Sequence, residues 1–241
     1  MGERPAFYAL QPGGWRDYVT LLHPPYTAWH LSYVAIGAAA APRLNGGRLG
    51  ASAAAFFFAV GLAAHALDEL NGRPLRTRIS DRALRVIAGS SLVLAVSLGV
   101  AGALSVTLWL FAFVGFGVFI VLAYNLEMFG GVFHSDLWFA VSWGAFPALT
   151  GYFAQAETIR WPVLFVAFAC LLLSLAQRRL STPVRRLRRS VTSLEGRMRL
   201  ADGTEVAVTD SMLREAPEAA LRVLALALSA LAGGLVAARL S

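Results

Sequence analysis

Long apolar runs separated by short polar segments are the dominant pattern along the chain. A membrane-spanning helix needs about 20 mainly apolar residues, and runs of roughly that length or longer cover residues 18–41, 49–67, 86–126, 137–156, 161–177 and 219–238. The run at 86–126 has no charged residue and is too long for one helix, so we expect a break near residues 102–105. Lipid leaves only helices or closed barrels as spanning structures, and these runs do not alternate as barrel strands do. The pattern therefore predicts an all-α, polytopic helical membrane bundle with about seven transmembrane helices.

Composition also indicates that lipid is the solvent. Apolar residues make up 57% of the chain and charged residues 15%, whereas soluble domains are about 45–50% apolar and about 25% charged. These values exclude an ordinary soluble enzyme and a disordered chain. All 21 basic residues are arginine, against 14 acidic residues, which gives a net charge of +7. Because the arginines flank the apolar runs, we interpret them as topology signals and as contacts to anionic membrane lipids, and we expect no nucleic-acid partner.

The arginine distribution predicts the orientation of the bundle. Segments 71–85 and 178–199 hold most of the arginines, and the positive-inside rule places such segments in the cytoplasm. We therefore expect a multi-pass protein of the cell (inner) membrane, with its N-terminus and active-site loops in the cytoplasm. The expected parts are a cytoplasmic or interfacial N-terminal segment (1–17), a six-helix membrane bundle (18–180), a cytoplasmic basic island (181–218) with a possible hairpin at Asp202-Gly203, and a last transmembrane helix (219–241).

The best candidate for chemistry is a triplet at the end of the second run. His65, Asp68 and Glu69 have i, i+3 and i+4 spacing, which puts them on one face of a helix. Ionisable groups within a span are costly and usually functional. An imidazole and two carboxylates can hold a divalent cation, and Mg²⁺ usually borrows further oxygens from substrate phosphates. The simpler alternative, a helix end whose acids pair with Arg73 or Arg76, is equally well supported.

Two pairs of arginines are candidates for binding a diphosphate. Arg73 and Arg78 follow the triplet, and Arg178 and Arg179 open the basic segment after residue 177. Guanidinium groups match phosphate oxygens in a bidentate way. For each arginine taken singly, topology and lipid contacts are the more economical explanation.

A glycine-containing loop between two later runs carries further polar groups. It follows Tyr124 and ends at Asp136. Glu127, His134 and Asp136 could complete a metal site or position an acceptor hydroxyl. The alternative is a surface loop whose acids are solvated.

Several of these motifs occur in a characteristic order along the chain. The segments are His65-Ala66-Leu67-Asp68, Arg73-Pro74-Leu75, Ile79-Ser80, Tyr124, Gly130-Gly131, Ser135-Asp136 and Gly151-Tyr152-Phe153. This order resembles the UbiA-type intramembrane prenyltransferases, most closely their menaquinone branch, which prenylates a dihydroxynaphthoate. The resemblance implies a UbiA-like fold, and Mg²⁺-assisted transfer of an isoprenyl group from a prenyl diphosphate to an aromatic or other lipid-soluble acceptor in quinone biosynthesis.

The resemblance also implies a role for each candidate residue. Asp68, Asp136 and Tyr124 would be catalytic, and His65, Asp68 and Glu69 would be the Mg²⁺ ligands. The diphosphate ligands would be Arg73, Arg78, Arg178 and Arg179.

The chain departs from this family at three points. Ala64-His65 replaces the Asn-Asp pair of the first acidic motif, no acid occurs at 176–185 where the family has its second motif, and the family has nine helices. Arginines cannot bind Mg²⁺, although they can bind phosphate directly. A non-catalytic UbiA-like scaffold or lipid-binding subunit is therefore the main alternative. A zinc-dependent lipid hydrolase is a third hypothesis, but it needs about three protein ligands and only His65 and His134 are plausible imidazoles.

Overall fold

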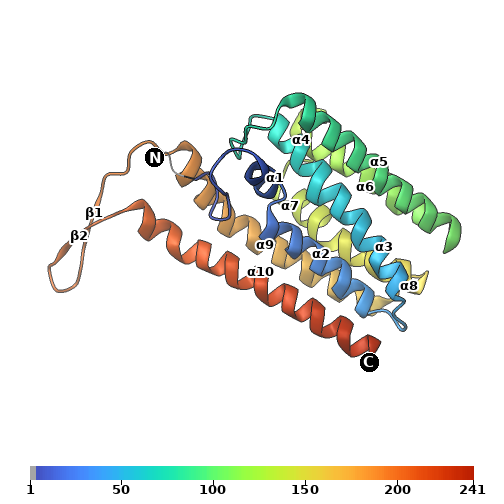
Figure 1. Ribbon diagram of the computed structural model, residues 1–241. Coiled ribbons are helices and arrows are strands. Elements are labelled where there is room, and N and C mark those ends of the chain that lie inside the picture. Colours follow the sequence, from blue (N-terminus) through green and yellow to red (C-terminus); the bar gives the residue numbers. More distant parts are fainter. Residues whose placement is uncertain (1–3) are drawn as a thin grey trace.

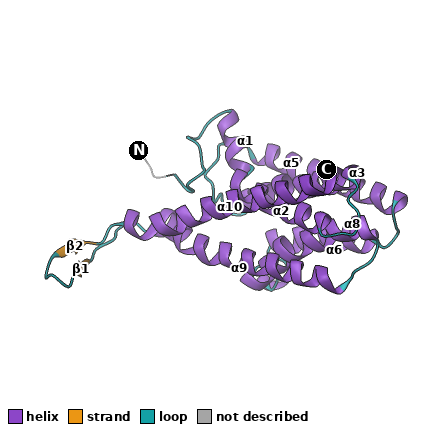
Figure 2. Cartoon of the chain, turned by 90° about the horizontal axis from the view of Figure 1, so that it is seen from below, coloured by secondary structure: helices purple, strands orange, loops and turns teal. Residues whose placement is uncertain are grey.

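The computed structural model describes residues 4–241, and helices account for nearly all of its regular structure (Figures 1 and 2). In chain order the elements are α1 (Trp15–Leu21), α2 (Pro24–Ala39), α3 (Gly46–Phe56), the π-helical η1 (Phe57–Ala64), α4 (His65–Leu70), α5 (Asp81–Ser105), α6 (Leu110–Asn125), the 3₁₀ turn η2 (Phe129–Gly131), α7 (Asp136–Ala140), the π-helical η3 (Val141–Ala145), α8 (Phe146–Ala156), α9 (Trp161–Ser190), β1 (Arg197–Arg199), β2 (Glu205–Ala207) and α10 (Asp210–Leu240). The all-α prediction is confirmed, because the two short strands form only one small hairpin.

Four helices in the described part of the chain are long and apolar enough to cross a membrane. They are the continuous rod Gly46–Leu70, which combines α3, η1 and α4, together with α5, α9 and α10. The expected count of about seven spans is not confirmed. One physical reason is length: α2 and α6 have 16 residues each, about 24 Å at 1.5 Å per residue, and a hydrocarbon core is about 30 Å thick.

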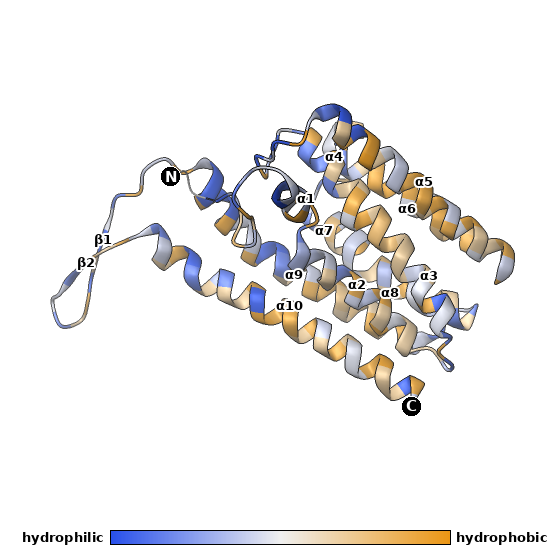
Figure 3. Cartoon of the chain, in the orientation of Figure 1, coloured by the Kyte–Doolittle hydropathy of each residue, from blue (hydrophilic) through white to orange (hydrophobic). Residues whose placement is uncertain are grey.

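The outer faces of the long helices are strongly apolar. Large apolar side chains on α5, α9 and α10 are more than half exposed, including Val93 (65%), Phe165 (67%) and Leu226 (72%). Orange, hydrophobic residues cover most of α5 and recur along the C-terminal part of α10 (Figure 3). A soluble monomer rarely exposes apolar patches of this extent. The four apolar helices therefore indicate a membrane-embedded protein.

Several expected boundaries shift in the structure. The run expected at 18–41 is divided, because α1 ends at Leu21 and α2 begins at Pro24. The break expected near 102–105 occurs directly after Ser105, and α6 begins at Leu110. The expected island at 181–218 is largely helical: α9 continues to Ser190 and α10 begins at Asp210. Only residues 191–209 lie between these two helices, and they contain the antiparallel hairpin of β1 and β2.

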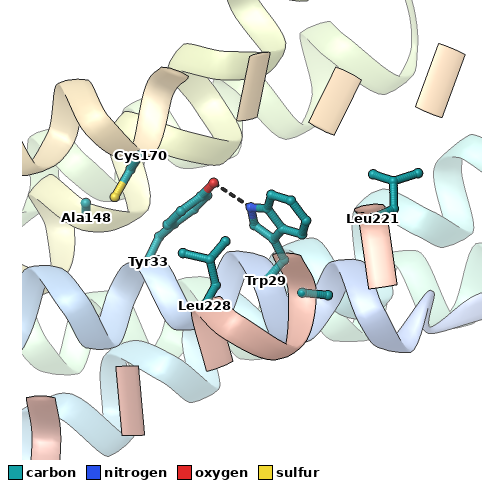
Figure 4. Packing of buried hydrophobic residues seen from close by; sticks show 7 residues of the cluster. Trp29, Tyr33, Ala148, Cys170, Leu221 and Leu228 are labelled. Carbon is teal, nitrogen blue, oxygen red and sulfur yellow. Dashed lines mark hydrogen bonds between the residues drawn. The ribbon is translucent and has the colours of Figure 1, made fainter. Parts of the chain in front are cut away.

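Helix α2 lies at the centre of the bundle, between α8 and α10 (Figure 1). Its side chains Trp29 and Tyr33 are fully buried, and the indole Nε1–H of Trp29 donates to the hydroxyl of Tyr33 (Figure 4). This pair packs against Cys170 of α9 and Leu228 of α10. The cluster thus joins α2 to two of the apolar helices.

The loops gather at two opposite ends of the bundle. At one end, which we call the loop end, lie residues 4–14, 71–80 and 126–135, and hydrogen bonds join them to each other and to neighbouring helices: the Arg78 amide donates to Asp17 Oδ2 (3.0 Å) and Asn71 Nδ2 donates to Glu127 Oε1 (3.4 Å). At the other end, Arg48 of α3 pairs with Glu157 at 2.8 Å. The loop end holds the candidate chemistry described below.

Candidate functional site

A polar cavity of about 280 Å³ opens at the loop end of the bundle. Its walls come from the N-terminal segment, α2, the rod Gly46–Leu70, α6, the loop after α6, α7–η3 and α9. The ionisable or hydroxyl-bearing residues that line it are Tyr8, His23, Tyr26, His30, His65, Asp68, Tyr124, Glu127, His134, Arg178, Ser181, Arg185 and Arg189. The cavity thus brings together the predicted site residues Asp68, His65, Tyr124 and Arg178, which are distant in sequence.

One face of α9 forms a basic wall of the cavity. Arg178, Ser181, Arg185 and Arg189 are spaced i, i+3, i+7 and i+11, so they follow one helical stripe, and all four line the cavity. Three guanidinium groups on one stripe repel each other unless an anion lies between them. Arg179, which we expected in the diphosphate site, is exposed on a different face of α9 and does not line the cavity.

Asp68 supplies a carboxylate to the same cavity. Its side chain makes no hydrogen bond or ion pair with any residue in the described range 4–241, although it is half-buried. Asn71 and Glu127, which also line the cavity, share a long hydrogen bond of 3.4 Å. Arg185 and Arg189 act on Asp68 electrostatically but form no ion pair with it, so its carboxylate is available to a ligand or a metal ion.

Glu69 has a structural role instead of the expected metal-binding one. Its side chain is fully buried, and its carboxylate accepts hydrogen bonds from the amide of Leu75 and from the amide and hydroxyl of Thr77, each at 2.9 Å. It does not line the cavity. On α4, Glu69 therefore points into the 71–80 loop, whereas its neighbour Asp68 lines the cavity.

The arginines of the 71–80 loop are also turned away from the cavity. Arg73 pairs with Asp81 and donates to the carbonyls of Thr77 (3.1 Å) and Ile79 (2.6 Å). The side chain of Arg78 is exposed. Neither residue lines the cavity, so the structure does not bring this predicted pair to the site.

Asp136 and Arg178, both predicted site residues, bind each other. Arg178 Nε donates to Asp136 Oδ1 at 2.9 Å, and the guanidinium lies 5.2 Å from the centre of the Phe139 ring. Asp136 stands at the rim and is not part of the lining. Tyr124 is buried in the wall, with its ring stacked on His134 at 4.5 Å. Asp136 therefore orients an arginine of the basic wall.

All four histidines of the chain line the cavity, which we did not predict. Three of them bond a backbone carbonyl through Nδ1: His65 to Gly61 (3.1 Å), His30 to Trp143 (2.7 Å) and His134 to Tyr124 (3.0 Å). The fourth, His23, bonds the Tyr8 hydroxyl through Nδ1 at 2.8 Å. Burial raises the pKa of Tyr8 well above its usual value, so the phenol keeps its proton near neutral pH.

An apolar groove of about 330 Å³ lies next to the polar cavity, between the rod Gly46–Leu70 and helices α5, α6 and α8. Val60 and Trp143 line both spaces. Val60 belongs to η1 and Trp143 to η3, so the junction is formed by the two π-helical segments. Such segments are rare and frequently occur at functional sites. A charged cavity and an apolar groove that share two wall residues fit the head and the tail of an amphiphilic ligand.

The oxygen donors of the cavity meet the minimum that Mg²⁺ requires. Among residues 4–241, no three His, Cys, Asp or Glu side chains are grouped as a complete protein metal site. Mg²⁺ usually binds one or two carboxylates and completes its shell with water and substrate phosphates. Asp68 fits that role because its carboxylate has no hydrogen-bond or ion-pair partner among residues 4–241, and Glu127 is the other carboxylate in the lining.

Comparisons with known proteins were made for the whole chain. No protein-family model, no curated protein and no solved structure matches it. The family resemblance of the motifs is therefore a prediction, which the geometry of the cavity and the groove must support by itself.

Proposed function

We propose that this chain is a UbiA-like membrane prenyltransferase that transfers an isoprenyl group from a prenyl diphosphate to a lipid-soluble acceptor. The observation that carries the proposal is the junction at Val60 and Trp143, where a polar cavity with three arginines meets an apolar groove. A prenyl diphosphate has the same division, because a strongly anionic head is joined to an apolar tail. The head would lie on the basic wall and the tail in the groove.

In this proposal the residues of the cavity lower the barrier to breaking the C–O bond of the donor. That bond breaks with its electron pair on the diphosphate, and Arg178, Arg185 and Arg189 stabilise the growing negative charge. Asp68 would hold Mg²⁺, which adds further positive charge on the leaving group. Tyr124 would orient the acceptor beside the donor carbon, and Asp136 would hold Arg178 in place.

We also propose the orientation of the protein in the cell membrane. The loop end, with segments 71–85 and 178–199, would face the cytoplasm, as the positive-inside rule requires. The helices α2, α6 and the rod 136–156 would cross the membrane with the four long helices, giving seven spans. The cavity would then open at the cytoplasmic surface, where water-soluble diphosphates reach it.

The proposal is tested with purified protein in lipid nanodiscs. With Mg²⁺, geranylgeranyl diphosphate and a panel of hydroxylated aromatic acceptors, the protein should release diphosphate. Asp68→Asn should lower the rate at least 100-fold, because it removes the carboxylate available to the metal. Arg185→Gln should lower the rate about 10- to 100-fold through loss of charge on the basic wall.

A matched acid outside the cavity provides the control. Asp81 lies at the same end of the bundle but pairs with Arg73, so Asp81→Asn should retain the wild-type rate. Equal loss of activity in Asp81→Asn and Asp68→Asn would contradict the assigned role of Asp68. Absence of diphosphate release with every donor and acceptor would contradict prenyl transfer.

A second candidate function is a membrane subunit that binds an anionic lipid without turnover. The observation that favours it is the basic stripe on α9, since arginines there can hold phosphate without a metal ion. The two functions differ in whether binding depends on Mg²⁺ and in whether the ligand is consumed. A binding subunit would bind geranylgeranyl diphosphate equally well with and without Mg²⁺, and it would leave the ligand intact.

A further inference from the structure

The polar cavity has a second chemical feature besides its basic wall, the paired imidazoles of His23 and His65. The two rings are stacked with their centres 4.0 Å apart and their planes 13° apart. His23 comes from the turn before α2 and His65 from the start of α4, so residues 42 positions apart build the pair. Both residues line the cavity.

The hydrogen bonds at Nδ1 define what each ring offers at Nε2. His65 Nδ1 lies 3.1 Å from the carbonyl oxygen of Gly61, which can only accept. The Nδ1 of His65 must therefore carry the hydrogen, and in the neutral ring Nε2 keeps its lone pair. His65 thus offers a hydrogen-bond acceptor.

His23 has the opposite arrangement. The Tyr8 hydroxyl, 2.8 Å from His23 Nδ1, has no other hydrogen-bond partner among residues 4–241, so within the protein its hydrogen is satisfied by donating to that nitrogen. Nδ1 is then the acceptor, and Nε2 of the neutral ring carries the hydrogen. His23 is only 9% exposed, and its Nε2 is buried without a protein partner in the described chain.

The pair consequently has one donor, His23 Nε2–H, and one acceptor, His65 Nε2, on two stacked rings that both belong to residues lining the cavity. A hydroxyl group is the simplest group that satisfies both, because its oxygen can accept from His23 Nε2–H while its hydrogen is donated to His65 Nε2. A buried N–H without a partner costs about 1–3 kcal/mol, which a bound hydroxyl would recover. A second sign of specialisation is the left-handed backbone of His23 (φ 47°), a strained conformation for a non-glycine residue.

We propose that His23 and His65 form a hydroxyl-binding subsite, separate from the basic wall, which recognises an apolar ligand by one O–H group. This inference rests on the proposed function in one respect, since the acceptor of the isoprenyl group would be that ligand. Tyr8 is a positioning residue in this subsite: it holds the hydrogen of His23 at Nε2 and does not contact the ligand itself.

The test uses two probes that differ only in the O–H group, 1-naphthol and 1-methoxynaphthalene. Their dissociation constants are measured on the full chain in nanodiscs, with empty nanodiscs as the partition reference. The wild-type protein should bind 1-naphthol at least tenfold more tightly than the ether, as expected for two hydrogen bonds. His23→Phe and His65→Phe should each reduce this ratio to below threefold while keeping an aromatic ring in the stack. Tyr8→Phe should reduce it by an intermediate factor.

The matched control is His134→Phe. This imidazole lines the same cavity but stacks on Tyr124 and has no second imidazole beside it, so the tenfold ratio should remain. A wild-type ratio near one would overturn the subsite and would mean that only water binds the pair. The same loss of preference in His134→Phe would overturn it too, because the effect would then belong to the cavity in general.

Binding of geranylgeranyl diphosphate is measured in parallel for every variant. It should be unchanged within twofold in His23→Phe, which also shows that this variant folds. If the protein prefers 1-naphthol but does not bind the diphosphate, the proposed function fails and the subsite stands. If the diphosphate binds and the preference is absent, the subsite fails and the proposed function stands.

Discussion

At the scale of single residues, adjacent carboxylates on α4 have opposite roles. Asp68 faces the cavity without a protein partner, whereas Glu69 is fully buried and accepts three hydrogen bonds from the 71–80 loop. The difference follows from the 100° rotation between consecutive helical positions. Glu69 therefore stabilises the 71–80 loop, whereas the Asp68 carboxylate remains available to a ligand in the cavity.

This division predicts the effect of Glu69→Gln. The amide can still accept from Thr77, but its NH₂ group would then meet the Leu75 amide, donor against donor. We expect a loss of about 2 kcal/mol for the unsatisfied buried donors. The thermal unfolding midpoint, followed by circular dichroism in detergent, should fall by roughly 4–8 °C.

The control for Glu69→Gln is Glu127→Gln. Glu127 is exposed and makes a single long hydrogen bond, of 3.4 Å, to Asn71. Its replacement should change stability by less than about 0.5 kcal/mol. Equal shifts in both variants would show that charge near the loop end, and not the hydrogen-bonded loop, determines stability.

Sequence reasoning found part of the site at this scale. Asp68, His65, Tyr124 and Arg178 were expected and line the cavity, because each lies on or beside a helix whose direction follows from its apolar run. Arg73 and Arg78 lie in a loop, where hydrogen bonds that no spacing rule describes determine the side-chain direction. If the helix is extended past residue 180, helical periodicity places Arg185 and Arg189, but not Arg179, on the same face as Arg178.

No sequence pattern indicated that the N-terminal segment contributes Tyr8 and His23 to the cavity. From sequence alone, Tyr8 and His23 are typical of the aromatic residues that are common next to membrane spans. Their place in the cavity depends on contacts with residues far along the chain, such as Arg189 Nε donating to the Pro5 carbonyl at 3.3 Å. Contacts of this kind become visible only in three dimensions.

At the scale of elements, the close crossing of α2 and α8 positions one side of the cavity. A Cβ atom on Gly151 would lie 2.2 Å from the carbonyl oxygen of Val34, and one on Gly37 would lie 2.0 Å from the carbonyl oxygen of Ala148. Both obstacles are backbone atoms, which cannot move without separating the helices. The two glycines therefore fix the distance between α2 and α8, and with it the place of His30.

Gly151→Ala should consequently destabilise the bundle. We expect a cost of at least about 2 kcal/mol from overpacking against backbone, measured as a lower thermal midpoint. Gly115→Ala on α6 is the matched control, since no atom lies within 4 Å of its Cβ position. There the substitution should be neutral or slightly stabilising, because alanine is the better helix former. A neutral result for Gly151→Ala would mean that the crossing is looser than described.

The existence of the helices could be predicted from the sequence better than their ends could. Apolar runs located the helices from α3 to α10, and the start of α2 coincides with Pro24, a residue that is favoured in the first turn of a helix. The polar, amphipathic ends of α9 and α10 were missed, because a hydropathy run ends where lipid exposure ends and not where the helix does. The π-helical segments η1 and η3 have no composition that distinguishes them from α-helix.

At the scale of the whole molecule, the polar space lies at the end of the bundle that holds the charged loops, and the apolar space lies among the apolar helices. The polar cavity lies at the loop end, and the apolar groove is adjacent to it, with Val60 and Trp143 in the walls of both. Hydrophobic residues predominate along the neighbouring helix α5 (Figure 3). An amphiphile bound with its head in the cavity would have the same orientation as a membrane lipid.

The junction of the two spaces provides the last prediction. Val60 lies in the wall of both, so Val60→Phe should obstruct the passage while leaving the arginines in place. Because each buried methylene contributes about 0.8 kcal/mol, geranylgeranyl diphosphate should bind wild-type protein at least 100-fold more tightly than inorganic diphosphate. Val60→Phe should reduce that ratio tenfold or more, with the affinity for inorganic diphosphate unchanged.

Val93→Phe is the matched substitution outside the junction. Val93 is 65% exposed on α5 and lines neither space, so its replacement should leave the ratio of the two affinities as in the wild type. Both variants are compared in the same nanodiscs, which cancels the partition of the isoprenoid tail into lipid. An unaltered ratio in Val60→Phe would show that the tail lies outside the groove, in the bilayer itself. In that case the cavity would recognise the headgroup alone, and tail length would not affect binding.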